Sequence, residues 1–338
     1  MPEPSLTSPK RRRGRLLRFG AALMVLFALA GYLVVQYVTG GTGAPGCKVV
    51  SGRADGKAYE FTPEQAVNAA TIAAVGTGRG MPQRAVAIAL ATALQESGLR
   101  NIEHGDRDSL GLFQQRPSQG WGTEKQIMDP SYAAGMFYEH LAKVPDYQDL
   151  PLTVAAQRVQ RSGYPEAYAK HEPDAALLAA ALTGRTAASL TCEGRQRTGT
   201  GTSAEAAATA TGPDAVRAAL VRDFGRDALQ EAGAEVGSAR STPTPTPSVA
   251  AEAQGRTVTV PVPDGAQTDA AGRSERERGW QLAHWAVANS TALHIRQVVY
   301  AGREWTAGST DSRWRGSRTG GAAGAERSVG SVQIVTGQ

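Results

Sequence analysis

The sequence predicts a mainly α protein with a single N-terminal transmembrane helix, an all-α domain, a flexible linker and a small α+β C-terminal domain. Three observations predict this class. Residues 19–38 carry no charge, and the segment from Cys47 to Cys192 shows helical start and stop signals without an alternating strand pattern. Residues 257–338 combine one helical pattern with short alternating runs.

The N-terminal segment is first basic and then apolar. Residues 1–18 contain a run of four basic residues at 10–13, and the uncharged residues 19–38 follow at once. Twenty helical residues at 1.5 Å each cross a hydrocarbon core of about 30 Å. Basic residues before the span predict a cytoplasmic N-terminus, a single-pass protein of the cell membrane and domains outside the cytoplasm. A cleaved signal peptide is the alternative, although the run is long for one and no clear cleavage site follows. We therefore interpret the basic run as a topology signal and expect no nucleic-acid partner.

Cys47 and Cys192 are the only two cysteines, and both follow the predicted span. An oxidising compartment favours a disulfide between them. Two free thiols or a lipidated Cys47 are the alternatives. A bridge that closes a loop of this length would stabilise the fold by roughly 4–5 kcal/mol in the loop-entropy model. The pair therefore delimits a predicted domain at 47–192.

Helix signals recur inside this domain. Thr62 is a typical N-cap, Pro63 suits the first helical position, and Gln65 completes a capping box. The helix that Pro82 opens is apolar on most faces, which indicates a buried helix. The predicted helices are 63–75, 82–97, 130–144, 152–161 and 165–182.

The C-terminal part divides into a linker and a tail. Residues 193–256 form a low-complexity linker with a predicted helix at 213–231 and Thr-Pro repeats at 241–248. Residues 257–338 form the predicted α+β tail domain. It contains strands at 257–260, 296–300 and 331–336, a helix at 280–292, and a loop at 315–326.

Glu96 stands where the buried helix ends, because Gly98 stops it. The negative end of the helix dipole and burial both raise the pKa of a carboxyl group. A protonated carboxyl in an apolar pocket is what a glycosidase general acid requires. A solvent-facing glutamate at a fraying helix end is the alternative. Gln114 and Gln115 follow in Gly-Leu-Phe-Gln-Gln, and amides suit sugar hydroxyl and N-acetyl groups.

The stretches ALQESGL at 93–99 and SLGLFQQRPS at 109–118 resemble the lysozyme-like lytic transglycosylase family. Its pattern is a helix-ending Glu-Ser followed by Gly-Leu-Phe/Met-Gln. The segment at 155–168 is similar to that family's Ala-Tyr-Asn-Ala-Gly segment with its later tyrosine, although Gln157 replaces the asparagine. The resemblance covers about residues 61–182.

The resemblance implies cleavage of peptidoglycan between N-acetylmuramic acid and N-acetylglucosamine by a lysozyme-like domain. Glu96 would protonate the glycosidic oxygen and then, as a base, take the proton of the muramyl C6 hydroxyl. The substrate-binding residues would be Ser97, Gln114, Gln115, Tyr164 and Tyr168. Gln114 capping the backbone and Tyr168 packing in the core are the alternatives.

Two further carboxylates, Asp106 and Asp108, lie close to this stretch. Either could orient a water molecule and make the enzyme a hydrolytic lysozyme. Turn formation and surface ion pairs are the alternative roles for both.

A closer resemblance is to an actinobacterial membrane-anchored group, some members of which are labelled heavy metal transporters. The five histidines and two cysteines form no cluster at metal-ligand spacing, and we expect neither a metal nor a cofactor. Trp280, Trp285 and Trp305 in the tail are interpreted as core residues, with stacking on sugars as the alternative. The sequence does not indicate which protein partners it has.

The leading hypothesis is therefore an extracytoplasmic, membrane-anchored lytic transglycosylase that acts on peptidoglycan glycan strands. The alternative hypothesis is a non-catalytic protein that binds or scaffolds the cell wall through the same groove.

Overall fold

The computed structural model describes residues 46–162, 165–194, 212–226, 255–262, 269, 272–308, 313–317 and 329–337. These residues belong to one compact unit, Pro45–Gln338. Its α-helices are α2 (Pro63–Gly78), α3 (Gln83–Ser97), α4 (Glu124–Ile127), α5 (Pro130–Ala142), α6 (Leu152–Gln160), α7 (Glu172–Leu182), α8 (Pro213–Phe224) and α11 (Glu275–Ala288). Two 3₁₀ helices are η1 (Pro117–Gln119) and η2 (Pro165–His171).

Strands accompany these helices in both halves of the described chain. They are β1 (Cys47–Val50), β2 (Ala58–Phe61), β3 (Leu190–Cys192), β4 (Thr257–Pro261), β5 (Ile295–Tyr300), β6 (Arg303–Thr306), β7 (Arg315–Gly316) and β8 (Ser331–Thr336). They form a three-stranded sheet of order β2-β1-β3 and a five-stranded sheet of order β4-β8-β5-β6-β7. All pairings are antiparallel.

The prediction of a mainly α protein is wrong, because these two antiparallel sheets make the fold mixed. The prediction of an all-α domain at 47–192 fails for the same reason. Within the described ranges, no helix has the length and apolar character needed to cross a membrane. The basic segment 1–18 and the predicted span 19–38 lie outside those ranges.

The disulfide between Cys47 and Cys192 is present, which confirms that prediction. The two cysteines are paired residues of the antiparallel strands β1 and β3. In β1 the side chains of Cys47 and Val49 are buried and those of Lys48 and Val50 are exposed. The bridge therefore joins β1 and β3, the first and last strands of the 47–192 region, and helices α2 to α7 lie between them in the chain.

The helices between these strands pack around α3, which contacts α2, α5, α6 and α7. The N-terminus of α2 has the predicted capping box: the Thr62 hydroxyl accepts from the Gln65 N–H, and the Gln65 side chain accepts from the Thr62 N–H. All side chains of α3 are buried except those of Gln83, Arg84, Gln95 and Glu96, as its apolar sequence predicts.

The predicted linker and tail are only partly visible in the described residues. The helix predicted at 213–231 is α8, which ends at Phe224, and most of the predicted linker 193–256, with its Thr-Pro repeats, lies outside the described ranges. The predicted tail strands correspond to β4, β5 and β8, while β6 and β7 were not predicted. The helix α11 begins at Glu275, five residues before the predicted start, with a capping box on Ser274.

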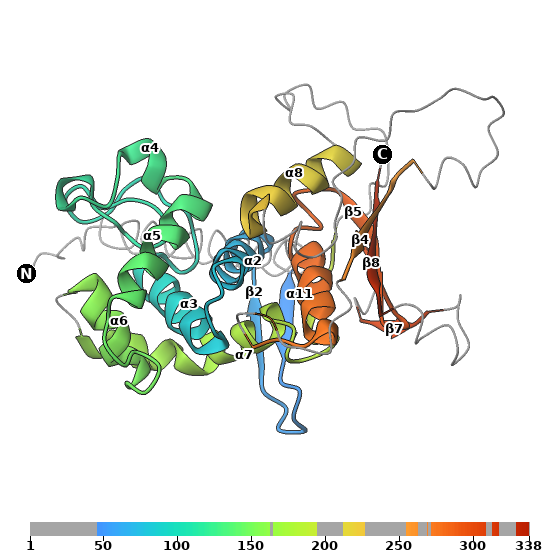
Figure 1. Ribbon diagram of the computed structural model, residues 1–338, viewed down its shortest axis with the longest axis horizontal. Coiled ribbons are helices and arrows are strands. Elements are labelled where there is room, and N and C mark those ends of the chain that lie inside the picture. The colour runs from blue at the N-terminus through green and yellow to red at the C-terminus, as the bar shows by residue number, and fades with distance from the viewer. Residues whose placement is uncertain are drawn as a thin grey trace, which may run out of the picture. The chain divides into compact units, whose positions relative to one another are not determined.

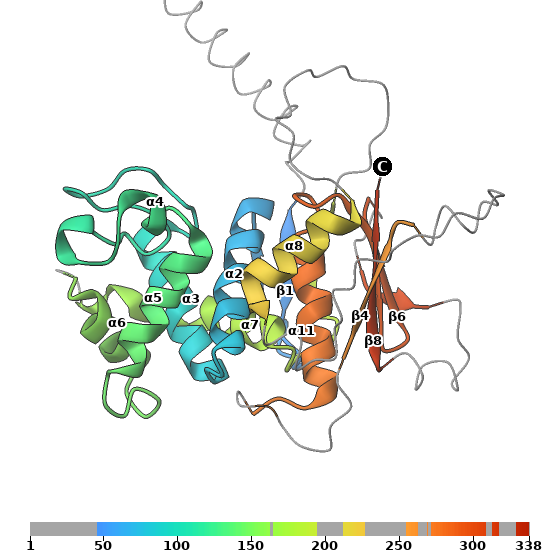
Figure 2. The ribbon, with the colours of Figure 1, turned by 45° about the horizontal axis from the view of Figure 1, so that its top comes forward.

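Helix α11 lies between α2 and the five-stranded sheet, as Figures 1 and 2 both show, and it contacts α2, α7, β5 and β8. Trp280, Trp285 and Trp305 are 2%, 1% and 0% exposed. Their burial confirms that they are core residues, and it leaves none of their rings free to stack on a sugar. The predicted tail therefore shares a core with the helices of the 47–192 region.

A buried carboxylate, Asp223 at the end of α8, bonds to three other helices. Its Oδ2 accepts hydrogen bonds from Thr71 Oγ1 of α2 (3.2 Å) and Trp285 Nε1 of α11 (2.8 Å). Its Oδ1 accepts from Ser131 Oγ of α5 (3.3 Å) and Arg222 Nε (2.8 Å). A buried carboxylate with four donors is fully satisfied, and losing it would leave donors buried without a partner.

We expect Asp223→Ala to lower the free energy of unfolding by about 2–3 kcal/mol, because it leaves the buried donors of Trp285 and Thr71 without an acceptor. Urea denaturation followed by tryptophan fluorescence measures the loss. The matched control is Asp214→Ala in the first turn of the same helix, where the side chain is exposed and we expect a change below about 1 kcal/mol. Equal effects of the two substitutions would contradict this role for Asp223.

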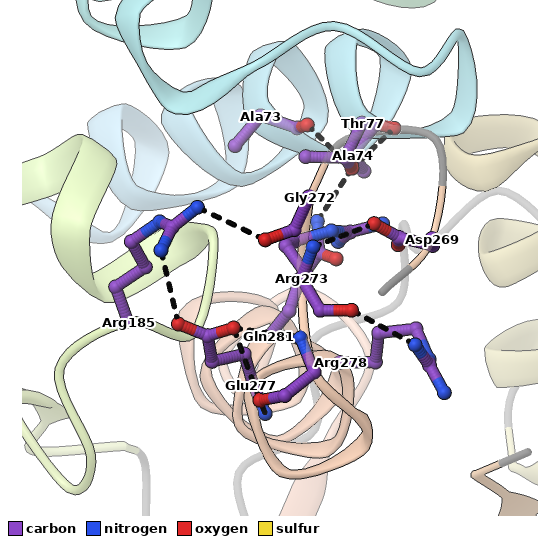
Figure 3. Close-up of polar contacts among 11 residues, drawn as sticks. Ala73, Ala74, Thr77, Arg185, Asp269, Gly272, Arg273, Glu277, Arg278 and Gln281 are labelled. Carbon is purple, nitrogen blue, oxygen red and sulfur yellow. Dashed lines mark hydrogen bonds and ion pairs between the residues drawn. The ribbon is translucent and has the colours of Figure 1, made fainter. Parts of the chain in front are cut away.

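Other polar contacts fix the first turns of α11 against α2 and the segment after α7. Arg185 donates to Glu277 Oε1 (3.3 Å) and to the Gly272 carbonyl (3.2 Å), and Gln281 Nε2 donates to Thr77 Oγ1 (2.6 Å), as Figure 3 shows. Gly184 has a φ of +80°, and a Cβ there would collide with the Glu277 carbonyl. The backbone of the two segments therefore meets too closely for any larger residue.

His284 of α11 is fully buried at the same junction. Its Nδ1 lies 2.7 Å from the Ala181 carbonyl of α7, and its Nε2 lies 3.2 Å from the Ser189 N–H before β3. Burial lowers the pKa of His284 to about 4, so the imidazole is neutral at physiological pH. A neutral ring with hydrogen on Nδ1 can donate to the carbonyl and accept from the amide.

Candidate functional site

The end of α3 positions Glu96 one residue before the helix stops. Gly98 adopts a left-handed conformation with a φ of 63°, and its N–H donates to the Leu94 carbonyl (3.1 Å). The N–H of Leu99 donates to the Ala93 carbonyl (3.0 Å). This is the usual glycine-terminated helix end, as the sequence predicts.

Two amide side chains of α2 hold the chain as it leaves α3. Gln65 Nε2 donates to the Gly98 carbonyl (2.8 Å), and Asn68 Nδ2 donates to the Leu99 carbonyl (2.8 Å). Asn68 is 6% exposed. The end of α3, and with it Glu96, is therefore fixed by the neighbouring helix.

The Ser97 hydroxyl forms hydrogen bonds with backbone carbonyls. Its Oγ lies 2.8 Å from the Leu112 carbonyl and 3.1 Å from the Ala93 carbonyl. In the loop that Ser97 contacts, Leu110 and Gln115 exchange a pair of backbone hydrogen bonds of 3.0 Å each. Ser97 thus attaches the Gly-Leu-Phe-Gln-Gln loop to the end of the helix that carries Glu96.

The same loop is anchored to α5. Leu112 and Phe113 are completely buried, and Phe113 stacks on Phe137 with ring centroids 4.8 Å apart. Gln115 is 2% exposed, and its Nε2 donates to the Ala133 carbonyl (3.0 Å), while its Oε1 has no hydrogen-bond partner among the residues that the structure describes. A buried amide oxygen without a partner keeps an acceptor available.

The Glu96 carboxyl group is largely buried, and Tyr168 supports it. Burial raises the pKa of Glu96, while hydrogen bonding by Tyr168 and Gln160 acts in the opposite direction. The Tyr168 hydroxyl donates to Glu96 Oε1 over 2.7 Å. Burial and the neighbouring carboxyl group raise the pKa of Tyr168, so the phenol keeps its proton.

An open cleft of about 840 Å³ lies beside Glu96. Its other walls come from residues of the 106–121 loop, from the end of α5 and the residues after it, and from the end of α6 with the following turn. Volumes of roughly 300–1,000 Å³ are usual for ligand sites. The cleft is therefore large enough to hold sugar residues against the Glu96 carboxyl.

The structure brings four of the predicted site residues to this cleft: Glu96, Gln114, Gln115 and Asp106. The Gln114 Nε2 also lies 3.3 Å from the Gly111 carbonyl, in line with the alternative backbone-capping role. Tyr164 lies outside the described residues.

Three other predicted site residues do not line the cleft. Ser97 is engaged with backbone carbonyls, as described above. Tyr168 is 0% exposed and contacts Glu96 from the core, so it positions the carboxyl rather than forming a wall. Asp108 binds Arg116 Nε (2.6 Å) and the Ser118 N–H (2.9 Å). These bonds hold the pKa of Asp108 well below its usual range, which suits a loop-fixing role.

Several cleft residues were missed by sequence reasoning. Trp121 stacks on His140 with ring centroids 4.2 Å apart, and both line the cleft. Burial lowers the pKa of His140, which favours a neutral ring. Gln160 also lines the cleft, and its Nε2 donates to the Phe113 carbonyl (2.7 Å). Trp121 stands next to the predicted stretch, and a tryptophan between two glycines was the available signal.

Metal ligands do not cluster in the part of the chain that the structure describes, where no group of three or more His, Cys, Asp or Glu could hold an ion.

Comparison with known proteins gives one partial match. No curated protein matches the chain. Residues 216–327, about one third of the chain, match the family described as VldE, C-terminal domain. The match begins inside α8, which contacts β4 and binds Trp285 through Asp223. The chain is thus similar to this family from α8 to the region before β8, and the cleft beside Glu96 lies outside the match.

Proposed function

We propose that the protein cleaves the glycan strands of peptidoglycan as a lytic transglycosylase, with Glu96 as its catalytic acid and base. The observation that carries this proposal is the Glu96 carboxyl itself. It is largely buried, has a raised pKa, and stands on the wall of a cleft of about 840 Å³. The disulfide between Cys47 and Cys192 supports an oxidising compartment outside the cytoplasm.

In the proposed reaction, Glu96 gives its proton to the glycosidic oxygen as the bond from that oxygen to the muramyl C1 breaks. The Glu96 carboxylate then takes the proton of the muramyl C6 hydroxyl, whose oxygen forms a new bond to C1. Glu96 loses one proton in the first step and regains one in the second, so it is protonated again at the end of the reaction. Tyr168 stabilises the carboxylate between the two steps by donating to Oε1.

Hydrolysis is the second candidate reaction, because Asp106 also lines the cleft and could orient a water molecule. Asp108 is less suited to that role, since Arg116 and Ser118 occupy its carboxylate.

The products of purified peptidoglycan treated with the full-length chain distinguish these reactions. We expect muropeptides with anhydro-muramyl ends, detected by mass spectrometry, and we expect Asp106→Asn to leave both their amount and their chemistry unchanged. Reducing ends that disappear in Asp106→Asn would show hydrolysis instead. Retention of the protein on the wall without product release would favour the non-catalytic wall-binding protein.

A further inference from the structure

The charges around the cleft are mostly positive. Five cationic side chains line it, namely Arg107, Arg116, Lys143, Arg158 and Arg161, against the carboxyl groups of Glu96 and Asp106. Clefts lined by charges of one sign concentrate the field and attract ligands of the opposite sign.

Two of these cations already have carboxylate partners. Arg116 pairs with Asp108 (2.6 Å), and Lys143 pairs with Glu139 (2.8 Å). Arg107, Arg158 and Arg161 form no ion pair within the ranges that the structure describes, and all three are exposed. We call these three the free arginines of the cleft.

The free arginines come from two walls. Arg107 belongs to the loop that precedes Gln114, and its φ is +59°. Arg158 lies in the last turn of α6, and Arg161 is the left-handed C-cap of that helix, with a φ of 52°. A ligand that fills the cleft beside Glu96 therefore meets arginines from two separate segments of its lining.

We propose that the free arginines make the cleft selective for glycan strands with free carboxylates, as on unamidated stem peptides. The inference rests on the proposed function and names the form of substrate that the site prefers. Guanidinium groups bind carboxylates through paired hydrogen bonds, and none of these three is engaged in an ion pair among the described residues. A strand whose carboxylates are amidated keeps every sugar contact and loses this attraction.

The test compares native glycan strands with strands whose stem carboxylates have been amidated chemically. We expect the full-length chain to cleave the native strands on the order of tenfold faster at low salt, and we expect added salt to reduce the ratio. Replacing the free arginines together (R107Q, R158Q and R161Q) should bring the ratio close to one. The matched control replaces three exposed arginines away from the cleft with Gln, at Arg53, Arg226 and Arg303, and should keep the ratio.

A binding measurement separates failure of this inference from failure of the proposed function. Soluble native and amidated strands are titrated against E96Q, with and without the three cleft substitutions. Equal affinity for both kinds of strand would overturn the inference, whether or not the wild type is active. A carboxylate preference that disappears with the free arginines would support it, and absence of cleavage of either strand by the wild type would then contradict only the catalytic proposal.

Discussion

Glu96→Gln is expected to reduce release of soluble muropeptides from peptidoglycan by 10²- to 10⁴-fold, the contribution usual for general acid–base catalysis (~10²–10⁴). The amide keeps the size of the side chain and can neither give a proton to the glycosidic oxygen nor take one from the C6 hydroxyl. Because the acid step needs a protonated carboxyl, wild-type activity should fall as pH rises through the raised pKa of Glu96. Initial rates measured across the pH range check both statements.

Glu96→Gln should lower activity without lowering the stability of the fold. Burial raises the folded-state pKa of Glu96, so the folded protein holds the proton more tightly than the unfolded chain. The stability from this difference is present at low pH and is lost as pH rises through the folded pKa. A neutral amide avoids the burial of charge, and Glu96→Gln should therefore unfold at the same or a higher temperature than wild type at neutral pH.

The matched control is Glu103→Gln, which changes an exposed carboxylate seven residues away that does not line the cleft. It should retain wild-type rates. Loss of activity in both variants, or a Glu96→Gln protein that is inactive because it unfolds, would count against the catalytic role.

Loss of the disulfide is expected to lower the free energy of unfolding by roughly 4–5 kcal/mol. Cys47 and Cys192 are 145 residues apart, and their bridge joins paired residues of β1 and β3. Without it, the unfolded chain gains the entropy of an open loop, and the central strand β1 of the three-stranded sheet loses its covalent link to the edge strand β3. Urea denaturation of the double variant Cys47→Ser/Cys192→Ser measures the difference.

Reductant gives the control for this prediction. It should destabilise the wild type by a similar amount and leave the double variant unchanged. In the reduced wild type and in the double variant, the free energy of unfolding should also fall more steeply with urea concentration, because an unbridged unfolded chain exposes more surface. A double variant as stable as oxidised wild type would show that the strands hold together without the bridge.

Much of the helical scaffold follows from local signals in the sequence. The capping box of Thr62 and Gln65, the N-cap Asp129 with Pro130, and the stop at Gly98 each use contacts within a few residues. The position of Glu96 at the end of a buried helix follows from the same signals. Local chemistry is enough in these cases because the partners of each bond are neighbours in the chain.

The strands were harder to predict because they are short and rely on distant partners. β1, β2 and β3 contain three or four residues each, and β3 pairs with a strand about 140 residues earlier. Three or four residues are too few for alternation to be recognised in the sequence, even in β1, where burial does alternate, so the prediction of an all-α domain missed them. The burial of Asp223 could not be predicted either, because its donors Thr71 and Trp285 come from helices far away in the chain.

Local signals in the sequence are enough to place the starts of α2, α5 and α6, the two cysteines on either side of the helices, and a carboxyl group at the end of the buried helix α3. The helix predicted at 165–182 is instead the 3₁₀ helix η2 followed by α7, and α8 and α11 differ from their predicted bounds. What surrounds that carboxyl follows only from tertiary packing: Tyr168 donates to it, and Gln115, Arg107, Arg158 and Arg161 line the same cleft. The tertiary structure also decided that the predicted tail packs into the core through α11. The physical reason is that caps and helix stops form between neighbours, whereas burial, pKa shifts and the charge of a cleft arise only when distant segments pack together.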